Sequence, residues 1–264
     1  MLLKQYHFMC GLPRAGNTLL ASLINQNPDV SVTANSMVAD IFIGAELLKQ
    51  QGVHKNYPDT KSLDNITKNI LPNYYSHWEA NHIIDRSIWG MQQHFEILKK
   101  HAPNDIKFIV PVRDLKQVVA SFVKYSYLTD DNYIADKART LQERCEYIMG
   151  DSGSLRKWVE CVWNLNKPEN REYCYFVEYD DLVNNPQKEI KQIYEFLGIE
   201  PFEHHYTNLS QLENNGIKYD DSVLGEGLHT VKEDKVEKTD YDMWDYLPKD
   251  VDEQYRLEPF WRNN

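Results

Sequence analysis

The hydrophobic pattern of the chain alternates between short apolar runs and stretches with helical spacing. Apolar runs end at Met9, Ile84, Val112 and Val177, and each is followed by residues whose apolar positions recur every three or four places. Short apolar runs are typical of strands buried on both faces, and the longer spacing is typical of amphipathic helices. Strand, helix and strand in succession predict parallel crossovers. The pattern therefore predicts an α/β fold with a central parallel sheet and helices on both faces.

Several helices can be bounded from this spacing and from their end signals. The best-defined helix follows Asn185, has Pro186 in its first turn and ends at Gly198. Asparagine and proline favour helix starts, and glycine favours helix ends. The spacing also predicts a helix over 35–50 and two helices within 138–165.

The loop over residues 11–18 joins the first apolar run to the first expected helix. It reads Gly-Leu-Pro-Arg-Ala-Gly-Asn-Thr, and such a loop gathers backbone N–H groups at a helix N-terminus, where a phosphate binds well. A lysine follows the second glycine in the ATP-binding P-loop, whereas Asn17 stands there in this chain. Arg14 adds a positive charge and Thr18 a hydroxyl. The loop favours a ligand with a single phosphate at this position, although a tight turn without a ligand shows the same pattern.

A second candidate position follows the apolar run that ends at Val112. Arg113 comes directly after this run, and Ser121 lies eight residues further on in the next expected helix. The carboxyl ends of parallel strands form the edge at which open α/β sheets bind ligands. This placement favours a role for Arg113 in binding, and the alternative is a structural salt bridge to Asp114.

Charge and cysteine usage narrow the classes of protein. The chain has 29 basic and 40 acidic residues and a formal net charge of -11, which argues against broad nucleic-acid binding and against binding to anionic membranes. Its four cysteines are scattered, with no spacing typical of metal ligands or of a disulfide framework. No apolar run approaches the roughly 18 residues of a membrane span, and the N-terminus does not resemble a signal peptide. We expect a cytoplasmic protein without a metal site.

Length and composition are compatible with one domain. A chain of 264 residues, 42% of them hydrophobic, can bury a substantial core. We expect a single domain over 1–264, in which the polar, aromatic-rich segment 201–264 folds back as an irregular cover. The sequence leaves the oligomeric state open.

Three motifs in this order resemble a known family. They are the loop 11–18 with Leu19-Leu20, the strand end Val112-Arg113-Asp114 with Ser121, and Tyr179-Asp180-Asp181-Leu182 followed by Phe196-Leu197-Gly198. Together they are similar to sulfotransferases that use 3′-phosphoadenosine 5′-phosphosulfate (PAPS), most of all to the bacterial and tyrosylprotein-sulfotransferase-like branch. The resemblance runs over nearly the whole chain. It implies a P-loop-like three-layer sandwich and PAPS as co-substrate, with 3′-phosphoadenosine 5′-phosphate (PAP) as product.

The family pattern implies a set of nucleotide-binding residues. In the family the glycine loop cradles the 5′-phosphosulfate, and the arginine and serine after the later strand bind the 3′-phosphate. A tyrosine and a late basic residue complete the site. The matching positions in this chain are Pro13, Arg14, Ala15, Gly16, Asn17, Thr18, Arg113, Ser121, Tyr179 and Lys232.

The resemblance also suggests catalytic roles. Sulfuryl transfer moves negative charge onto the bridging oxygen of the departing nucleotide, and a cation aimed at that oxygen stabilises it without a metal. Arg14 suits this role. Arg86 matches a family lysine that contacts the transferring group, and Asp85 could orient it.

The general base is not identified by the resemblance. The tyrosylprotein enzymes carry a glutamate where this chain has Asn35, and the cytosolic small-molecule enzymes carry a histidine where it has Ile88. The candidates by nearness in sequence are Asp40, Glu46 and Asp85.

The acceptor and two alternative functions remain open from the sequence. The acceptor is a small molecule, a glycan or a peptide with a hydroxyl or amine, and its pocket is expected between the segment 35–78 and the C-terminal segment. One alternative is a P-loop nucleotide or small-molecule kinase, which requires Mg²⁺ and a lysine near the phosphates. The other is a noncatalytic nucleotide-binding protein of the same fold.

Overall fold

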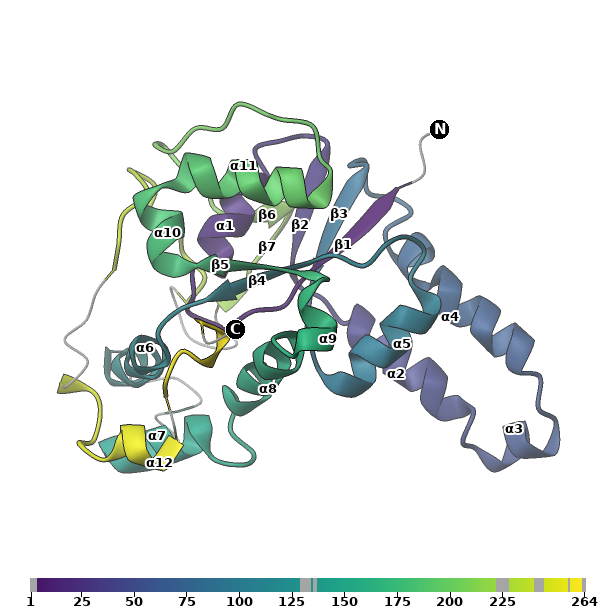
Figure 1. The fold of residues 1–264 in the computed structure, drawn as a ribbon, viewed down its shortest axis with the longest axis horizontal. Coiled ribbons are helices and arrows are strands. Elements are labelled where there is room, and N and C mark those ends of the chain that lie inside the picture. The colour runs from purple at the N-terminus through teal and green to yellow at the C-terminus, as the bar shows by residue number, and fades with distance from the viewer. Residues whose placement is uncertain are drawn as a thin grey trace.

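A parallel sheet forms the centre of the computed structural model, which describes residues 4–128, 134, 137–221, 228–239, 245–255 and 257–262. Its five strands are ordered β2-β3-β1-β4-β5, and every neighbouring pair is parallel (Figure 1). The strands are β1 (Gln5–Met9), β2 (Val30–Asn35), β3 (His82–Arg86), β4 (Phe108–Val112) and β5 (Cys174–Glu178). The predicted central parallel sheet is confirmed.

Successive side chains of the strands enter two separate cores. Phe8 of β1 and Ile83 of β3 belong to one core, and the next residues, Met9 and Ile84, belong to the other. This alternation follows from the period of two along a strand. Because both faces of the sheet are covered by apolar side chains, the apolar runs in the sequence are nearly continuous.

Helices cover both faces and make three layers. The core around Met9 and Ile84 is closed by α1 (Asn17–Ile24), α10 (Tyr179–Asn184) and α11 (Pro186–Leu197). The core around Phe8 is closed by a larger set, which consists of α2 (Val38–Leu48), α4 (Thr60–Tyr74), α5 (Gln92–His101), α6 (Leu115–Leu128), α7 (Leu141–Met149) and α8 (Arg156–Leu165). The short helix α3 (Gly52–Asn56) links α2 to α4, and the short helix α9 (Pro168–Arg171) lies between α8 and β5. In Figure 1, α2, α3 and α4 extend away from the sheet as a helical arm.

The expected helix boundaries agree with the structure except for the helix expected over 35–50, which spans Val38–Leu48. The helix expected over 35–50 begins at Val38, because Asn35 still pairs with Arg86 in the sheet. Helix α11 has Pro186 in its first turn and ends at Gly198, whose φ of 75° is left-handed. Glycine takes this conformation without steric cost.

The described part of the segment after residue 201 contains more regular structure than expected. Residues Glu213–Asn214 (β6) and Ile217–Lys218 (β7) form an antiparallel hairpin. Its turn is Asn215-Gly216, and both residues have positive φ, which is the conformation that a two-residue hairpin prefers. Further on lie α12 (Val251–Tyr255) and a 3₁₀ turn over Phe260–Arg262.

Two further findings concern membranes and thiols. None of the helices within the described ranges is both long enough and apolar enough to cross a membrane. Cys10, Cys145 and Cys161 are buried free thiols, and Cys174 is a half-buried one. Burial raises the pKa of the Cys145 thiol to about 12, which makes it a poor nucleophile at neutral pH.

Candidate functional site

The glycine loop between β1 and α1 is held in its shape by close packing and by one side chain. A Cβ at Gly11 would lie 2.2 Å from the carbonyl oxygen of Pro111, so only glycine fits there. Gly16 precedes α1 with a φ of 79°. Asn17 donates from Nδ2 to the carbonyl oxygen of Leu12 at 2.7 Å. Asn17 stands where the P-loop has its lysine, and its hydrogen bond connects the two ends of the loop.

The loop delivers free backbone donors to the carboxyl edge of the sheet. Helix α1 begins at Asn17, and no side chain caps its first turn. The first N–H groups of a helix have no partner within the helix and attract an anion. The hydroxyl-bearing Thr18 lies in the same first turn.

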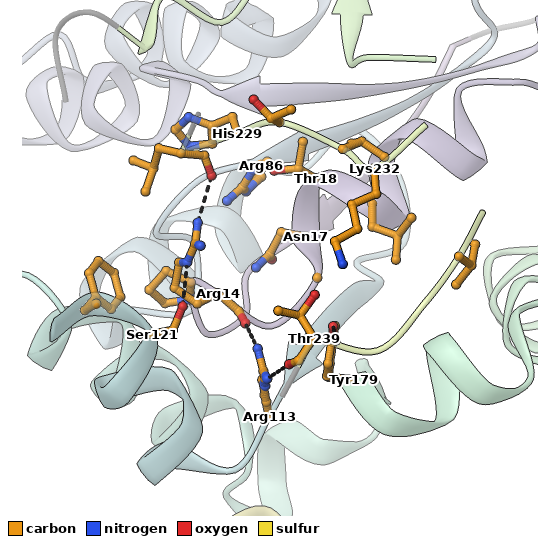
Figure 2. A pocket seen from close by; sticks show the side chains of 18 of the residues that line it. Arg14, Asn17, Thr18, Arg86, Arg113, Ser121, Tyr179, His229, Lys232 and Thr239 are labelled. Carbon is orange, nitrogen blue, oxygen red and sulfur yellow. Dashed lines mark hydrogen bonds between the residues drawn. The ribbon is translucent and has the colours of Figure 1, made fainter. Parts of the chain in front are cut away.

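Arg14 is held across the mouth of this loop by two other segments. Its Nε donates to Ser121 Oγ of α6 at 3.0 Å, and its Nη1 donates to the carbonyl oxygen of Leu228 at 2.8 Å (Figure 2). Its φ of 60° is left-handed, a strained backbone for a residue with a side chain. The strain is consistent with a loop shaped for a ligand.

Arg113 lies at the end of β4, below Arg14. Its Nη1 donates to the Arg14 carbonyl oxygen at 3.2 Å, and its Nη2 donates to the carbonyl oxygen of Thr239. Its guanidinium lies 4.2 Å from the ring centroid of Tyr179, and the Tyr179 hydroxyl accepts from the Thr239 N–H at 3.0 Å. The Asp114 carboxylate accepts the N–H groups of the first turn of α6. Arg113 is therefore fixed by the loop, by Tyr179 and by the C-terminal segment at once.

Arg86 enters from the end of β3. Its Nη1 donates to the hydroxyl of Tyr219 at 2.9 Å, and its backbone N–H donates to Thr33 Oγ1. Arg86 is buried, and this burial lowers the pKa of its guanidinium. Within the described ranges, neither Arg86 nor Arg14 forms an ion pair with a carboxylate. A buried cation without a counter-ion is costly, so the site is suited to an anionic ligand.

These residues surround one cavity of about 280 Å³. Figure 2 shows Arg14, Arg86, Arg113 and Lys232 around it, from segments far apart in the sequence. Of the residues predicted from the sequence to bind the nucleotide, the cavity wall includes Pro13, Arg14, Gly16, Asn17, Thr18, Arg113, Ser121, Tyr179 and Lys232. Ala15 lies in the same loop but is fully buried. Lys232 is exposed, and its Nζ lies 2.5 Å from Glu237 Oε1.

Asp85 is not brought into this cavity, which corrects the expectation that it orients Arg86. The carboxyl group is fully buried and accepts from Trp89 Nε1 at 2.5 Å and from the Tyr75 hydroxyl. Burial raises its pKa. Neighbouring residues of a strand face opposite sides of the sheet, so Asp85 enters the core while Arg86 enters the cavity.

The other two candidate bases also lie elsewhere. Asp40 is exposed on α2, and Glu46 of the same helix takes part in a network with Asp64, His101 and Lys49. Neither lines the cavity. Both positions are near Asn35 in sequence, but α2 runs away from the sheet edge.

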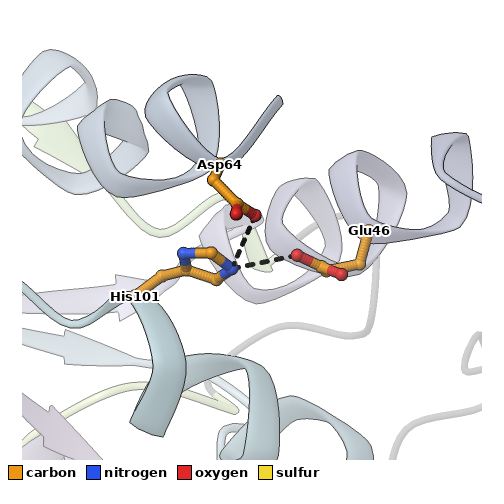
Figure 3. Close-up of side chains that lie close together, drawn as sticks. All are labelled: Glu46, Asp64 and His101. Carbon is orange, nitrogen blue, oxygen red and sulfur yellow. Dashed lines mark hydrogen bonds and ion pairs between the residues drawn. The ribbon is translucent and has the colours of Figure 1, made fainter. Parts of the chain in front are cut away.

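The network around Glu46 has the composition of a cation site. Figure 3 shows Glu46, Asp64 and His101 pointing toward one another, and their ligand atoms lie within 4.8 Å of one another. The ammonium of Lys49 is 2.6 Å from Asp64 Oδ1 and also bonds Glu46. The hydrogen bond from Lys49 lowers the pKa of Asp64. Lys49 already supplies the positive charge, so this cluster is a salt-bridge network of the helical arm.

The structure adds three residues that the sequence did not assign to the site. His229 lines the cavity, its Nδ1 lies 2.6 Å from Asp221 Oδ1, and its ring stacks on Tyr219 with centroids 3.8 Å apart. The sequence pointed to the stretch 229–232, but the contact was assigned to Lys232. No spacing rule connects a histidine to an aspartate eight residues earlier across a loop.

A second cavity of about 140 Å³ lies next to the first, and Asn35 lines both. Its walls include Tyr74 at the end of α4, Tyr75 and Trp78 just after that helix, and Tyr219 from the C-terminal segment. It therefore lies between the two segments that were expected to hold the acceptor.

Comparison with solved structures shows the same fold in sulfotransferases. The sulfotransferase domain from the curacin biosynthetic pathway matches with a TM-score of 0.58 and 17% identity, over 98% of this chain and 99% of that domain. Mouse sulfotransferase SULT7A1, solved in complex with PAP, matches with a TM-score of 0.54 and 16% identity, over 98% of this chain and 87% of the mouse chain. The predicted P-loop-like three-layer fold is confirmed.

Sequence comparison agrees with the fold. A Caenorhabditis briggsae protein that carries the name protein-tyrosine sulfotransferase is 21% identical over 242 residues, which are 86% of this chain and 79% of that protein. The family model described as the sulfotransferase family matches residues 7–204, a span that includes the glycine loop, Arg86 and Arg113. From this match over most of its length, and from the cavity that those residues line, the chain belongs to the sulfotransferase family.

Proposed function

We propose that this chain transfers a sulfuryl group from PAPS to a hydroxyl or amine of an acceptor, in line and without a metal. The observation that carries the proposal is the pair of arginines beside the glycine loop, Arg14 and Arg86, which have no carboxylate partner among the residues that the structure describes. PAPS is an anion with phosphate at both ends of its ribose, and a site of this kind suits it. The mouse enzyme of the same fold was solved with PAP.

The two anionic groups of PAPS would determine how it lies in the cavity. The 5′-phosphosulfate would receive the first N–H groups of α1 and the Thr18 hydroxyl, because a helix N-terminus favours phosphate. The 3′-phosphate would lie at Arg113 and Ser121, with Tyr179 and Lys232 beside the nucleotide. The Arg113 guanidinium stacks on the Tyr179 ring, 4.2 Å from its centroid. This contact fixes the plane of the guanidinium, whose paired N–H groups match phosphate oxygens.

The same cations suit the transfer step. As the sulfur–oxygen bond to the nucleotide breaks, negative charge grows on the bridging oxygen, and a fixed cation there lowers the barrier. The hydrogen bonds from Arg14 to Ser121 and to the Leu228 carbonyl oxygen fix its guanidinium, which supports this role. Arg86 would contact the transferring group itself.

The acceptor would approach through the second cavity. Its aromatic wall, formed by Tyr74, Tyr75, Trp78 and Tyr219, suits a planar or apolar acceptor group better than a polyanion, which agrees with the acidic net charge. A small molecule, a glycan residue or the tyrosine of a peptide would fit these conditions.

The transfer itself is tested with ³⁵S-labelled PAPS and a panel of acceptors. The panel contains simple phenols, an aliphatic alcohol, an aliphatic amine, a monosaccharide and a tyrosine peptide, each with and without EDTA. We expect label in at least one acceptor and equal rates with EDTA. Phosphate transfer from ATP that requires Mg²⁺ would support the kinase alternative. PAP binding without transfer to any acceptor would support the noncatalytic one.

We also propose that the protein acts in the cytoplasm. Its four cysteines are free thiols, as expected in a reducing compartment. Fractionation of cells that express the tagged chain should recover it with cytoplasmic markers, and recovery outside the cell would contradict the proposal.

A further inference from the structure

We propose that His229 is the general base of the transfer reaction and that Asp221 is its positioning residue. The inference rests on the proposed function, because it assigns the proton acceptor of that same reaction. His229 lies in the loop 228–232. The family resemblance points to two other positions for the base. Those positions hold Asn35 and Ile88, and neither an amide nor an alkyl side chain accepts a proton at neutral pH.

The contacts of the imidazole fix which nitrogen is free. Nδ1 lies 2.6 Å from Asp221 Oδ1, and the backbone N–H of His229 donates to Asp221 Oδ2 at 3.0 Å. A carboxylate only accepts, so Nδ1 carries the proton and Nε2 carries a lone pair. Nε2 has no hydrogen-bond partner within the part of the chain that the structure describes. This is the arrangement in which an aspartate orients a histidine base.

The ring plane is fixed as well. The His229 imidazole lies parallel to the Tyr219 ring, with an angle of 2° and centroids 3.8 Å apart. The Tyr219 hydroxyl in turn accepts from Arg86. The imidazole is therefore held on its edge by Asp221 and on its face by Tyr219.

This position adjoins the proposed transfer point. The carbonyl oxygen of Leu228, the neighbour of His229, accepts from Arg14, and Tyr219 connects the ring to Arg86. Arg14, Arg86 and His229 line the first cavity, and Tyr219 lines the second. Figure 2 shows His229 at the wall of the first cavity, near Arg86. The imidazole thus lies between the proposed donor site and Tyr219 of the proposed acceptor site.

The surroundings keep the imidazole uncharged in the free protein. Burial lowers its pKa below the ordinary 6.5, the Asp221 carboxylate raises it, and Arg86 and Arg14 lower it, with a net decrease. Among the described residues, the titratable group stacked on the ring is Tyr219. The histidine is therefore neutral at pH 7, the form that a general base requires.

In the proposed step, the acceptor oxygen forms a bond to sulfur while the bond from sulfur to the bridging phosphate oxygen breaks. The electron pair of that bond remains on the phosphate of PAP. The acceptor proton moves to Nε2 of His229, and the Asp221 carboxylate stabilises the imidazolium. Water then takes the proton, and the base is regenerated.

The first test compares His229→Ala with wild type, using ³⁵S-labelled PAPS and phenols of decreasing acidity, from 4-nitrophenol to 4-methylphenol. We expect kcat with 4-methylphenol to fall by about 10²- to 10⁴-fold. The loss with 4-nitrophenol should be much smaller, since that phenol ionises without help. His205→Ala, which alters an exposed histidine, is the matched control. Affinity for PAP should stay within about threefold, which shows that the variant is folded.

Asp221→Asn tests the positioning role by the pH profile. The acid limb of kcat/KM for the phenol at saturating PAPS should move to lower pH, because the carboxylate that raises the histidine pKa is gone. The ¹⁵N spectrum of labelled histidine should show the Nδ1–H form in wild type and a mixture of tautomers in Asp221→Asn. A merely structural aspartate would change neither.

The outcomes separate this inference from the proposed function. If wild type transfers label and His229→Ala retains its rate with 4-methylphenol, or if the loss is equal for all phenols, His229 is not the base. If wild type transfers no label to any acceptor, it is the proposed function that fails.

Discussion

At the scale of single residues, Asn17 marks the difference between this loop and an ATP-binding loop. Its amide donates to the Leu12 carbonyl oxygen at 2.7 Å. The positive charge comes instead from Arg14 of the same loop and from Arg86 and Arg113 of other segments. Arginine offers a planar fork of donors that matches phosphate and sulfate oxygens, whereas lysine offers a point charge. The site therefore recognises its anion with geometry as well as with charge.

Arg113→Ala should weaken PAP binding by about 2 to 3 kcal/mol, because a charged partner of the 3′-phosphate is lost. Titration calorimetry with PAP measures this loss. Arg156→Ala, which removes an exposed arginine paired with Glu160, is the control and should bind as wild type does. Equal affinity of Arg113→Ala and wild type would remove Arg113 from the site.

The sequence located the residues whose positions follow from local pattern, and it missed those that depend on orientation or on contacts across loops. Arg113 was found because it follows an apolar run. The prediction that Asp85 orients Arg86 was wrong because consecutive residues of β3 point to opposite faces of the sheet. His229 was missed because its partner Asp221 lies across a loop, at a spacing that belongs to no regular element.

At the scale of elements, the loop between β1 and α1 depends on the backbone of Gly16. Its φ of 79° lies where other residues are strained, and a Cβ there would lie 3.0 Å from the Tyr179 ring. The absence of a side chain at Gly16 thus allows the loop and the start of α1 to pack closely against Tyr179 of α10.

Gly16→Ala should lower the free energy of unfolding by about 1 to 2 kcal/mol, the cost of a left-handed residue with a side chain. It should also weaken PAP binding, since the N–H groups of α1 shift. Gly44→Ala is the matched control: Gly44 lies within α2 with nothing near its added Cβ, and alanine there should raise the unfolding free energy by roughly 0.5 to 1 kcal/mol. Denaturant melts measure both. Equal effects of the two variants would contradict the account of the loop.

The strands β1, β3, β4 and β5 and the longer helices that follow them could be predicted because each shows its own period, whereas the short helices α3, α9 and α10 were not predicted. The hairpin β6–β7 was not predicted, although its Asn215-Gly216 turn is a known signal. Its strands are too short to show alternation, and its Asn214 bonds the carbonyl oxygen of Val32 and the side chain of Asn25, contacts that no local pattern reveals. The start of α2 was placed early because the pairing of Asn35 with Arg86 cannot be seen from one strand alone.

At the scale of the whole molecule, the C-terminal segment packs on both faces of the sheet. We therefore propose that 1–264 unfolds as one domain. Leu209, Leu212 and Val231 enter the core of α1 and α11, while Leu257 and Trp261 enter the opposite core. The indole of Trp261 donates to Glu178 Oε1 at 2.8 Å. One segment thus contributes to both faces of the sheet and to the cavity.

Trp261→Ala should lower the free energy of unfolding by about 3 to 5 kcal/mol, as expected for a large buried side chain. Wild type should unfold in a single transition by both tryptophan fluorescence and far-ultraviolet circular dichroism. Trp163→Ala, which alters a tryptophan 58% exposed, is the control and should change stability by less than about 1 kcal/mol. Two separate transitions in wild type would contradict a single domain.

Binding of the PAPS nucleotide in the arginine-lined cavity underlies every role proposed for these residues. The most direct measurement is calorimetric titration of the purified protein with PAP, with and without EDTA, and with AMP as the ligand that lacks the 3′-phosphate. We expect PAP to bind with a micromolar dissociation constant that EDTA does not change. The affinity for AMP should be much lower. Absence of PAP binding, or equal affinity for AMP and PAP, would contradict this expectation.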